Sequence, residues 1–321
     1  MSRLSISTET LEGTASIFTQ RKSGMDVRRT SRSLLDNSEA CASKLAAYYA
    51  LYMSTTLLDL DLSPDTLCSG WMCVVLLLSF YPLRANPRPL EDVLARVMAY
   101  VALYLLIDHH LDSPNITREE KQDMLQWLSA PMPSECLRKS GVLRLIDELG
   151  GRDEAPRLAA MVVSSYRAQL NSTLSEKEYL HACKDKGGIT VVVGVRLTIG
   201  ALKNVQEKDL YRLGYCIQLL DDLVDCSGDR RNDINTACTC RLRKKGNVDS
   251  VVWRLLYKST CLPRALEYHA WGIRCAAIRV CARTGNVSGS LRSVLGLGSD
   301  KIREECLRMR VERALRKACA G

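Results

Sequence analysis

The chain has 321 residues, of which 46% are hydrophobic and 25% charged, and its net charge is +9. These values are ordinary for a soluble globular protein with an apolar core. The basic residues are scattered, and no basic run is interleaved with aromatic residues, which argues against nucleic acid as a partner. An anionic membrane or an anionic small substrate remains as the reason for the positive charge.

Fourteen cysteines are present, but they contain no CxxC pair, and the four histidines complete no zinc-binding spacing with them. No secretory signal is recognisable at the N-terminus. The cysteines are therefore predicted to be reduced, small core residues, and the protein to be cytoplasmic.

In chain order, residues 1–36 are rich in Ser, Thr and Arg and are predicted to be a flexible N-terminal arm. No linker, repeat or sustained period-two alternation divides the remainder, so 37–321 is predicted to be one all-helical domain. Helical patterns cover 39–58, 66–81, 90–112, 117–130, 135–149, 154–172, 176–202, 206–226, 247–283 and 299–320, with a polar loop before 247.

Two of these segments need comment. The apolar run 66–81 falls short of the roughly 20 residues that a membrane span requires, so a buried core helix is expected and no transmembrane segment. Segment 176–202 contains Gly187–Gly188, which should bend or unwind the helix locally.

The stretch QLLDDLVDCSGD, Gln218–Asp229, places four acids directly after an apolar run. On a helix, Asp221 and Asp225 lie on one face one turn apart, and Asp222 and Asp229 add to the crowding of negative charge. Ligands that are all oxygen favour a hard cation, so these four aspartates are predicted to bind Mg²⁺.

A second acidic pair, Asp108 and Asp112 in IDHHLD, repeats this spacing at the end of another apolar helix. If the two helices face each other across a cavity, the carboxylates would hold several Mg²⁺ ions and a substrate diphosphate. The apolar helix walls would then hold a hydrocarbon chain away from water. Solvated acidic helix ends, paired with Lys or Arg, are the alternative.

These motifs resemble those of the trans-prenyl diphosphate synthases, farnesyl and geranylgeranyl diphosphate synthase among them. QLLDDLVDCSGD is similar to the second aspartate-rich motif of that family and LLIDHHLD to the first. YLHACKDKGG, Tyr179–Gly188, resembles the segment that carries the diphosphate-contacting lysine. The resemblance covers about Leu90 to Thr236, and it implies the class I isoprenoid synthase fold, an all-α bundle with a central active-site cavity.

Carried over by position, the resemblance implies that Asp108 and Asp112 bind two Mg²⁺ ions and that Asp221, with Asp225, binds a third; Mn²⁺ is the alternative metal. Lys186 would contact the allylic diphosphate and complete the catalytic set, and Gln218 would line the same site.

Other substrate-binding residues are implied at the edges of the site. Arg118 occupies part of the position of the family's Arg-Arg pair. Tyr104, one turn before Asp108, would form the floor of the cavity and limit product length, or it would simply be core. Arg230 and Arg231 would close over the diphosphate, or neutralise the acids beside them.

The sequence also departs from the family. His109 replaces an Asp, the Gly-Lys-x-x-Arg-Pro stretch that grips the second diphosphate has no convincing counterpart, and NDINTA replaces the usual residues after the second motif. The allylic half is therefore better matched than the isopentenyl half, which suits a terpene synthase. DHHLDSPN and DCSGDRR also resemble squalene and phytoene synthases, in which Asp225 and Asp229 would be the metal pair.

Three hypotheses follow. The first is a Mg²⁺-dependent trans-prenyltransferase that ionises an allylic prenyl diphosphate, adds isopentenyl diphosphate and makes a short prenyl diphosphate. The second is a terpene synthase that cyclises or hydrolyses farnesyl or geranylgeranyl diphosphate. The third is a non-catalytic homologue that acts as a binding protein. The resemblance further implies a homodimer.

Overall fold

The computed structural model describes residues 45–46, 49–50, 52–53, 64–112, 117, 119–120, 149, 155–171 and 173–295. Within these ranges the elements are helical, with one isolated bridge between Arg84 and Leu202 and no β-strand. The all-α prediction is confirmed for this part of the chain. The predicted arm 1–36 and final helix 299–320 lie outside the described residues, as do most of 117–130 and 135–149.

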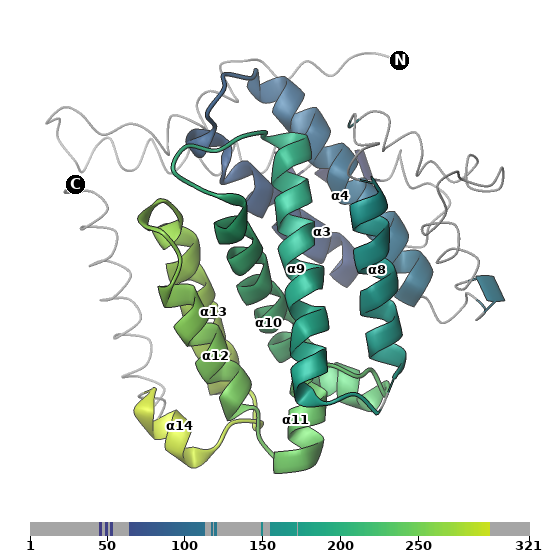
Figure 1. Ribbon diagram of the computed structural model, residues 1–321, viewed down its shortest axis with the longest axis vertical. Coiled ribbons are helices and arrows are strands. Elements are labelled where there is room, and N and C mark those ends of the chain that lie inside the picture. Colours follow the sequence, from purple (N-terminus) through teal and green to yellow (C-terminus); the bar gives the residue numbers. More distant parts are fainter. Residues whose placement is uncertain are drawn as a thin grey trace, which may run out of the picture. The chain divides into compact units, whose positions relative to one another are not determined.

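Figure 1 labels the helices along the chain. In order they are α3 (Pro64–Leu78), α4 (Leu90–Asp112), α8 (Ala155–Leu170), α9 (Glu176–Thr198), α10 (Glu207–Arg231), α11 (Ala237–Lys245), α12 (Asp249–Thr260), α13 (Glu267–Arg283) and α14 (Gly289–Val294). Two short 3-10 helices, η1 (Tyr81–Leu83) and η2 (Arg264–Leu266), complete the described set.

The chain divides into two compact units, and the first comprises Met1–Ala159 and Val193–Lys203. In this unit α3 packs against α4. Gly70 makes the contact close, because a Cβ there would lie 2.8 Å from a methyl carbon of Leu105. The guanidinium of Arg96 donates to the carbonyls of Leu149 and Leu197, at 2.8 and 3.2 Å, and so ties the end of α9 to α4.

Helix α3 is buried on one face only, which corrects the prediction of a core helix. Val74 and Leu77 are buried, but Met72 and Val75 are 61% and 44% exposed. None of the described helices combines the length and the apolarity that crossing a membrane would need.

The second unit comprises Ala160–Val192 and Asn204–Gly321, and α10 is its central element. Helix α10 contacts α11, α12 and α13, and α12 packs on α13. The apolar side chains of Leu213, Leu219 and Leu223 on α10 are fully buried, as are Leu255 on α12 and Leu266 in η2. Burial of an apolar side chain of this size contributes about 1.5–3 kcal/mol.

Helix α11 lies where the sequence predicts only a polar loop. Its N-terminus has a reciprocal cap, in which Thr236 and Thr239 each accept a hydrogen bond from the backbone amide of the other, at 3.2 and 2.8 Å. Its C-terminus ends at Gly246, whose φ of 68° is the left-handed conformation that glycine adopts without strain. The sequence prediction missed this helix because its nine residues have little apolar periodicity, and the two caps are the helix signals that they carry.

The nine cysteines whose side chains the structure describes are all free thiols. Six of them are buried, and they lie at Cys183, Cys216, Cys226, Cys238, Cys240 and Cys281. In this part of the chain cysteine is therefore a small core residue, as predicted.

Candidate functional site

The candidate site is built on a close crossing of α9 and α10, which run side by side in Figure 1. A Cβ on Gly187 would lie 2.2 Å from the carbonyl oxygen of Gly214, and a Cβ on Gly214 would lie 2.0 Å from the carbonyl oxygen of Gly187. Only glycine at both positions permits this approach. Gly188 extends the contact, because a Cβ there would lie 2.5 Å from the ring of Tyr211.

Of the two predicted effects of Gly187–Gly188, a local unwinding of the helix is wrong, and a bend stays a prediction. Helix α9 continues without a break from Glu176 to Thr198. A glycine inside a helix costs about 1 kcal/mol relative to alanine, and here the gain is a close helix–helix contact. The sequence shows the glycines but not the partner helix that explains them.

Helix α10 carries the four acids of the second motif. It runs to Arg231, five residues beyond the predicted end, so that Asp229 is also helical. Asp221 and Asp225 are exposed, Asp229 is half-buried and Asp222 is buried. The helical spacing of four residues thus leaves Asp221 and Asp225 on an accessible face, as the sequence predicts.

Asp222 differs from the others because it is held by hydrogen bonds. The side-chain amide of Gln218 donates to Oδ1 of Asp222 at 3.0 Å and to Oδ2 of Asp221 at 3.1 Å. The thiol of Cys183, on α9, also hydrogen-bonds Asp222. Gln218 therefore bridges two carboxylates, and Cys183 fixes one of them to the neighbouring helix.

The electrostatics of the cluster reflect crowding. Burial raises the pKa of Asp222 to about 6, although the hydrogen bond from Gln218 opposes the shift. Burial, followed by the charges of the other three acids, raises the pKa of Asp229 to about 7. Burial and the charge of Asp221 also raise the pKa of Asp225. Ionising all four acids together is costly, and a nearby cation would lower that cost.

One positively charged side chain, Lys186, already lies on α9. Its charge partly offsets the rise in the pKa of three of the carboxyl groups, those of Asp222, Asp225 and Asp229. Lys186 and Cys183 are three residues apart, so both lie on the side of α9 that faces the acids. The Gly187 crossing is adjacent in sequence and brings this side of α9 to α10.

The donor set suits a hard cation. Among the residues that the structure describes, no group of three or more His, Cys, Asp or Glu side chains forms a ready-made metal cage. Mg²⁺ does not require one, because it usually binds through one or two carboxylates together with substrate phosphates and water. Asp221 and Asp225 offer exposed carboxylates of this kind.

The first acidic motif falls at the limit of the described residues. Asp108 and Asp112 lie in the last turns of α4, and their side chains are outside the described part, as is Arg118. Tyr104 is half-buried on α4. The convergence of this motif with the acids of α10 stays a prediction.

The remaining predicted residues are Arg230 and Arg231, which are exposed in the last turn of α10. Basic residues there interact favourably with the negative end of the helix dipole. Cys183 is the site residue that the sequence did not single out. Its position three residues before Lys186 was the available signal.

Comparison with protein-family models, with curated proteins and with solved structures finds no match to this chain.

Proposed function

We propose that the chain is a Mg²⁺-dependent class I isoprenoid synthase that ionises an allylic prenyl diphosphate, and that it is a trans-prenyltransferase making a short prenyl diphosphate. The observation that carries this proposal is the α9–α10 pair. In this pair the charge of Lys186 acts on Asp222, Asp225 and Asp229, whose pKa values are raised by burial and by neighbouring acids, so positive charge stabilises the cluster.

In this proposal the residues of the site have different roles. Asp221 and Asp225 would hold Mg²⁺, which neutralises charge on the diphosphate and makes it a leaving group. Lys186 would bind a diphosphate oxygen directly. Gln218 and Cys183 hold Asp222 in place, and Gln218 also orients Asp221. In the same proposal, Asp108 and Asp112 supply the second half of the metal site.

The substrate side of the proposal rests on the motifs in the sequence. An allylic diphosphate such as geranyl or farnesyl diphosphate would be the first substrate and isopentenyl diphosphate the second. The proposal includes a cytoplasmic location and a homodimer.

The test is a product assay with purified full-length protein, Mg²⁺ and geranyl or farnesyl diphosphate, with and without isopentenyl diphosphate. Longer prenyl diphosphates formed only when both substrates are present support the prenyltransferase. Hydrocarbons or alcohols from a single substrate would instead assign a terpene synthase.

The matched variants are Asp221→Asn/Asp225→Asn for the site and Asp233→Asn for the control. Asp233 is exposed after α10 with φ of 53°, a conformation that asparagine tolerates well. Diphosphate release by the wild type and the control, but not by the double variant, is expected. No release by any of the three proteins would overturn the enzymatic proposal and leave a binding protein.

A further inference from the structure

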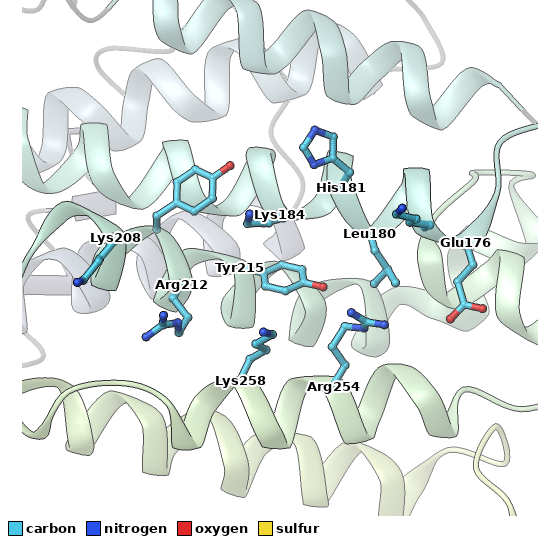
Figure 2. Close-up of a pocket in the computed structure, with 11 residues that line it drawn as sticks. Glu176, Leu180, His181, Lys184, Lys208, Arg212, Tyr215, Arg254 and Lys258 are labelled. Carbon is cyan, nitrogen blue, oxygen red and sulfur yellow. The ribbon is translucent and has the colours of Figure 1, made fainter.

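A second charged feature lies in the same unit, in an open groove of about 800 Å³ between α9, α10 and α12. The groove is lined mainly by basic side chains, and Figure 2 draws its lining residues as sticks. Its six Lys and Arg residues are Lys177 and Lys184 on α9, Lys208 and Arg212 on α10, and Arg254 and Lys258 on α12.

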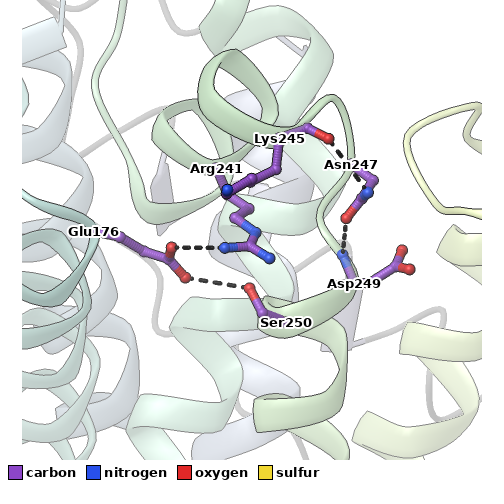
Figure 3. A network of polar contacts seen from close by, with 6 residues as sticks. All are labelled: Glu176, Arg241, Lys245, Asn247, Asp249 and Ser250. Atoms are coloured by element: carbon purple, nitrogen blue, oxygen red, sulfur yellow. Dashed lines mark hydrogen bonds and ion pairs between the residues drawn. The ribbon is translucent and has the colours of Figure 1, made fainter.

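The charge of the groove is almost uncompensated from within. Glu176 is the one acid in its lining. The carboxylate of Glu176 accepts hydrogen bonds from Arg241 at 3.3 Å and from Ser250 at 3.2 Å, as Figure 3 shows. Arg241 lies outside the groove and pairs with this acid, so Glu176 offsets little of the positive charge of the groove.

The two tyrosines of the groove are already engaged by neighbouring side chains. The hydroxyl of Tyr211 donates to Asp185, and the ammonium of Lys184 lies 5.3 Å from the Tyr211 ring. Tyr215 is buried and its side chain hydrogen-bonds Arg254, which points toward it from α12 in Figure 2. The groups left for a ligand are therefore chiefly the ammonium and guanidinium groups.

Four of the cationic side chains, those of Lys177, Lys184, Lys208 and Arg254, are exposed to solvent. Arg212 is partly engaged, because its guanidinium donates to the carbonyl of Cys261 at 2.6 Å and lies 3.9 Å from Asp209. Arg212 is therefore held in place, whereas the exposed lysines are accessible to a ligand.

We propose that this groove binds a small molecule carrying two or more phosphate groups. Arginine and lysine are the side chains that recognise phosphate oxygens, and cations from three helices surround one recess. The volume is in the range of small-molecule sites. Single-stranded nucleic acid would require open aromatic faces for stacking, whereas Tyr211 lies under Lys184 and Tyr215 is buried.

The groove is distinct from the aspartate site. Lys184 and Lys186 are two residues apart on α9, which places them about 200° apart around the helix. Lys184 lines the groove, whereas Lys186 acts on the aspartates of the motif Gln218–Asp229, and none of those four aspartates lines the groove. Binding in the groove should therefore need no divalent metal.

The test is calorimetric titration of the full chain with tripolyphosphate in the presence of EDTA, with inorganic monophosphate as the comparison ligand. Tripolyphosphate should bind more tightly than monophosphate, and added salt should weaken it. Lys177→Gln/Lys184→Gln/Arg254→Gln should weaken tripolyphosphate binding at least about ten-fold, because three close charges are removed. The charge-matched control is Lys203→Gln/Lys244→Gln/Lys245→Gln, whose three lysines are exposed and outside the groove.

A double variant, Lys177→Gln/Lys184→Gln, repeats the test without altering Arg254, whose side chain contacts the buried Tyr215. The control triple should bind as the wild type does, and so should Asp221→Asn/Asp225→Asn, since that variant alters only the aspartate site. Equal weakening in the groove and control variants, or no tripolyphosphate binding, would overturn the proposal. Binding of single-stranded oligonucleotide or of phosphatidylserine vesicles that is lost in the groove variant, while tripolyphosphate does not bind, would assign the groove to that partner instead.

Discussion

The helix pair α9–α10 carries two regions of opposite charge. In one, four acids of the motif Gln218–Asp229 gather near the charge of Lys186, and burial and mutual repulsion raise the pKa values of Asp222, Asp225 and Asp229. In the other, six basic side chains line a groove with one acid that is neutralised from outside. Both regions concentrate charge of one sign, and both suit phosphate, the first through a metal and the second directly.

The difference lies in how the charged groups are held. The aspartate region is fixed by short-range packing, since Gln218 and Cys183 bind Asp222 and the glycine crossing sets the helix spacing. Such preorganisation is what a reaction site requires. The basic groove is lined by long side chains, four of them exposed, which suits adaptable binding rather than chemistry.

The largest effect is expected from the aspartates. Asp221→Asn/Asp225→Asn should lower the rate of Mg²⁺-dependent diphosphate release by about 1,000-fold, because losing the metal removes several kcal/mol of transition-state stabilisation. Single-turnover kinetics with geranyl diphosphate would measure it. A rate within about three-fold of the wild type would remove the functional contrast between the two regions.

The glycine crossing provides the second prediction. Gly214→Ala should lower the free energy of unfolding by about 3 kcal/mol, because the new methyl group meets the backbone of α9 at 2.0 Å. Gly228→Ala is the control in the same helix, since nothing lies within 4 Å of a Cβ there. It should be neutral or stabilise by up to about 1 kcal/mol. Denaturant unfolding of both variants checks the contrast, and equal destabilisation would contradict the close crossing.

A smaller effect is expected at Gln218. Gln218→Leu should lower the free energy of unfolding at pH 7 by about 2 kcal/mol, because the buried carboxylate of Asp222 loses a hydrogen-bond donor. The loss should shrink near pH 5, where Asp222, with a pKa of about 6, is mostly protonated. An unchanged loss at both pH values would show that the effect is one of packing alone.

The smallest effect concerns pH. The pKa of Asp229 is about 7 in the folded protein against 3.8 as the reference value, so the folded state holds the proton between these values. The raised pKa of Asp229 therefore stabilises the folded protein fully below pH 4, and this stabilisation is lost as the pH rises toward 7. Asp229→Asn should gain about 1 kcal/mol relative to wild type between pH 4 and pH 8, after allowance for solvent screening. Urea unfolding across this range measures it, with Asp233→Asn as the control that should show no such gain.

The all-helical fold class and the accessible pair of acids on α10 could be predicted from the sequence. The apolar runs predicted α4 and α10, and a spacing of four residues placed Asp221 and Asp225 together. The spacing of apolar and acidic residues along a single segment is enough to predict these features. It does not reveal the residue of another helix against which Gly187 packs, so a helix interruption was predicted where a close crossing occurs.

The groove and the short helices show the same limit. The basic side chains of the groove come from three helices, and along the sequence they are simply scattered. Their convergence depends on tertiary packing, which no single segment encodes. Helix α11 lacks an apolar stripe of useful length, and its capping threonines become meaningful only once the helix is known.

The most direct test of the central claim is a titration of Mn²⁺, as a paramagnetic substitute for Mg²⁺, into the full chain with inorganic pyrophosphate, followed by water proton relaxation. Wild-type protein, Asp233→Asn and Lys177→Gln/Lys184→Gln should all bind Mn²⁺ with pyrophosphate, whereas Asp221→Asn/Asp225→Asn should lose this binding. Equal Mn²⁺ binding by all four proteins, or binding by none, would contradict a metal and diphosphate site on α10.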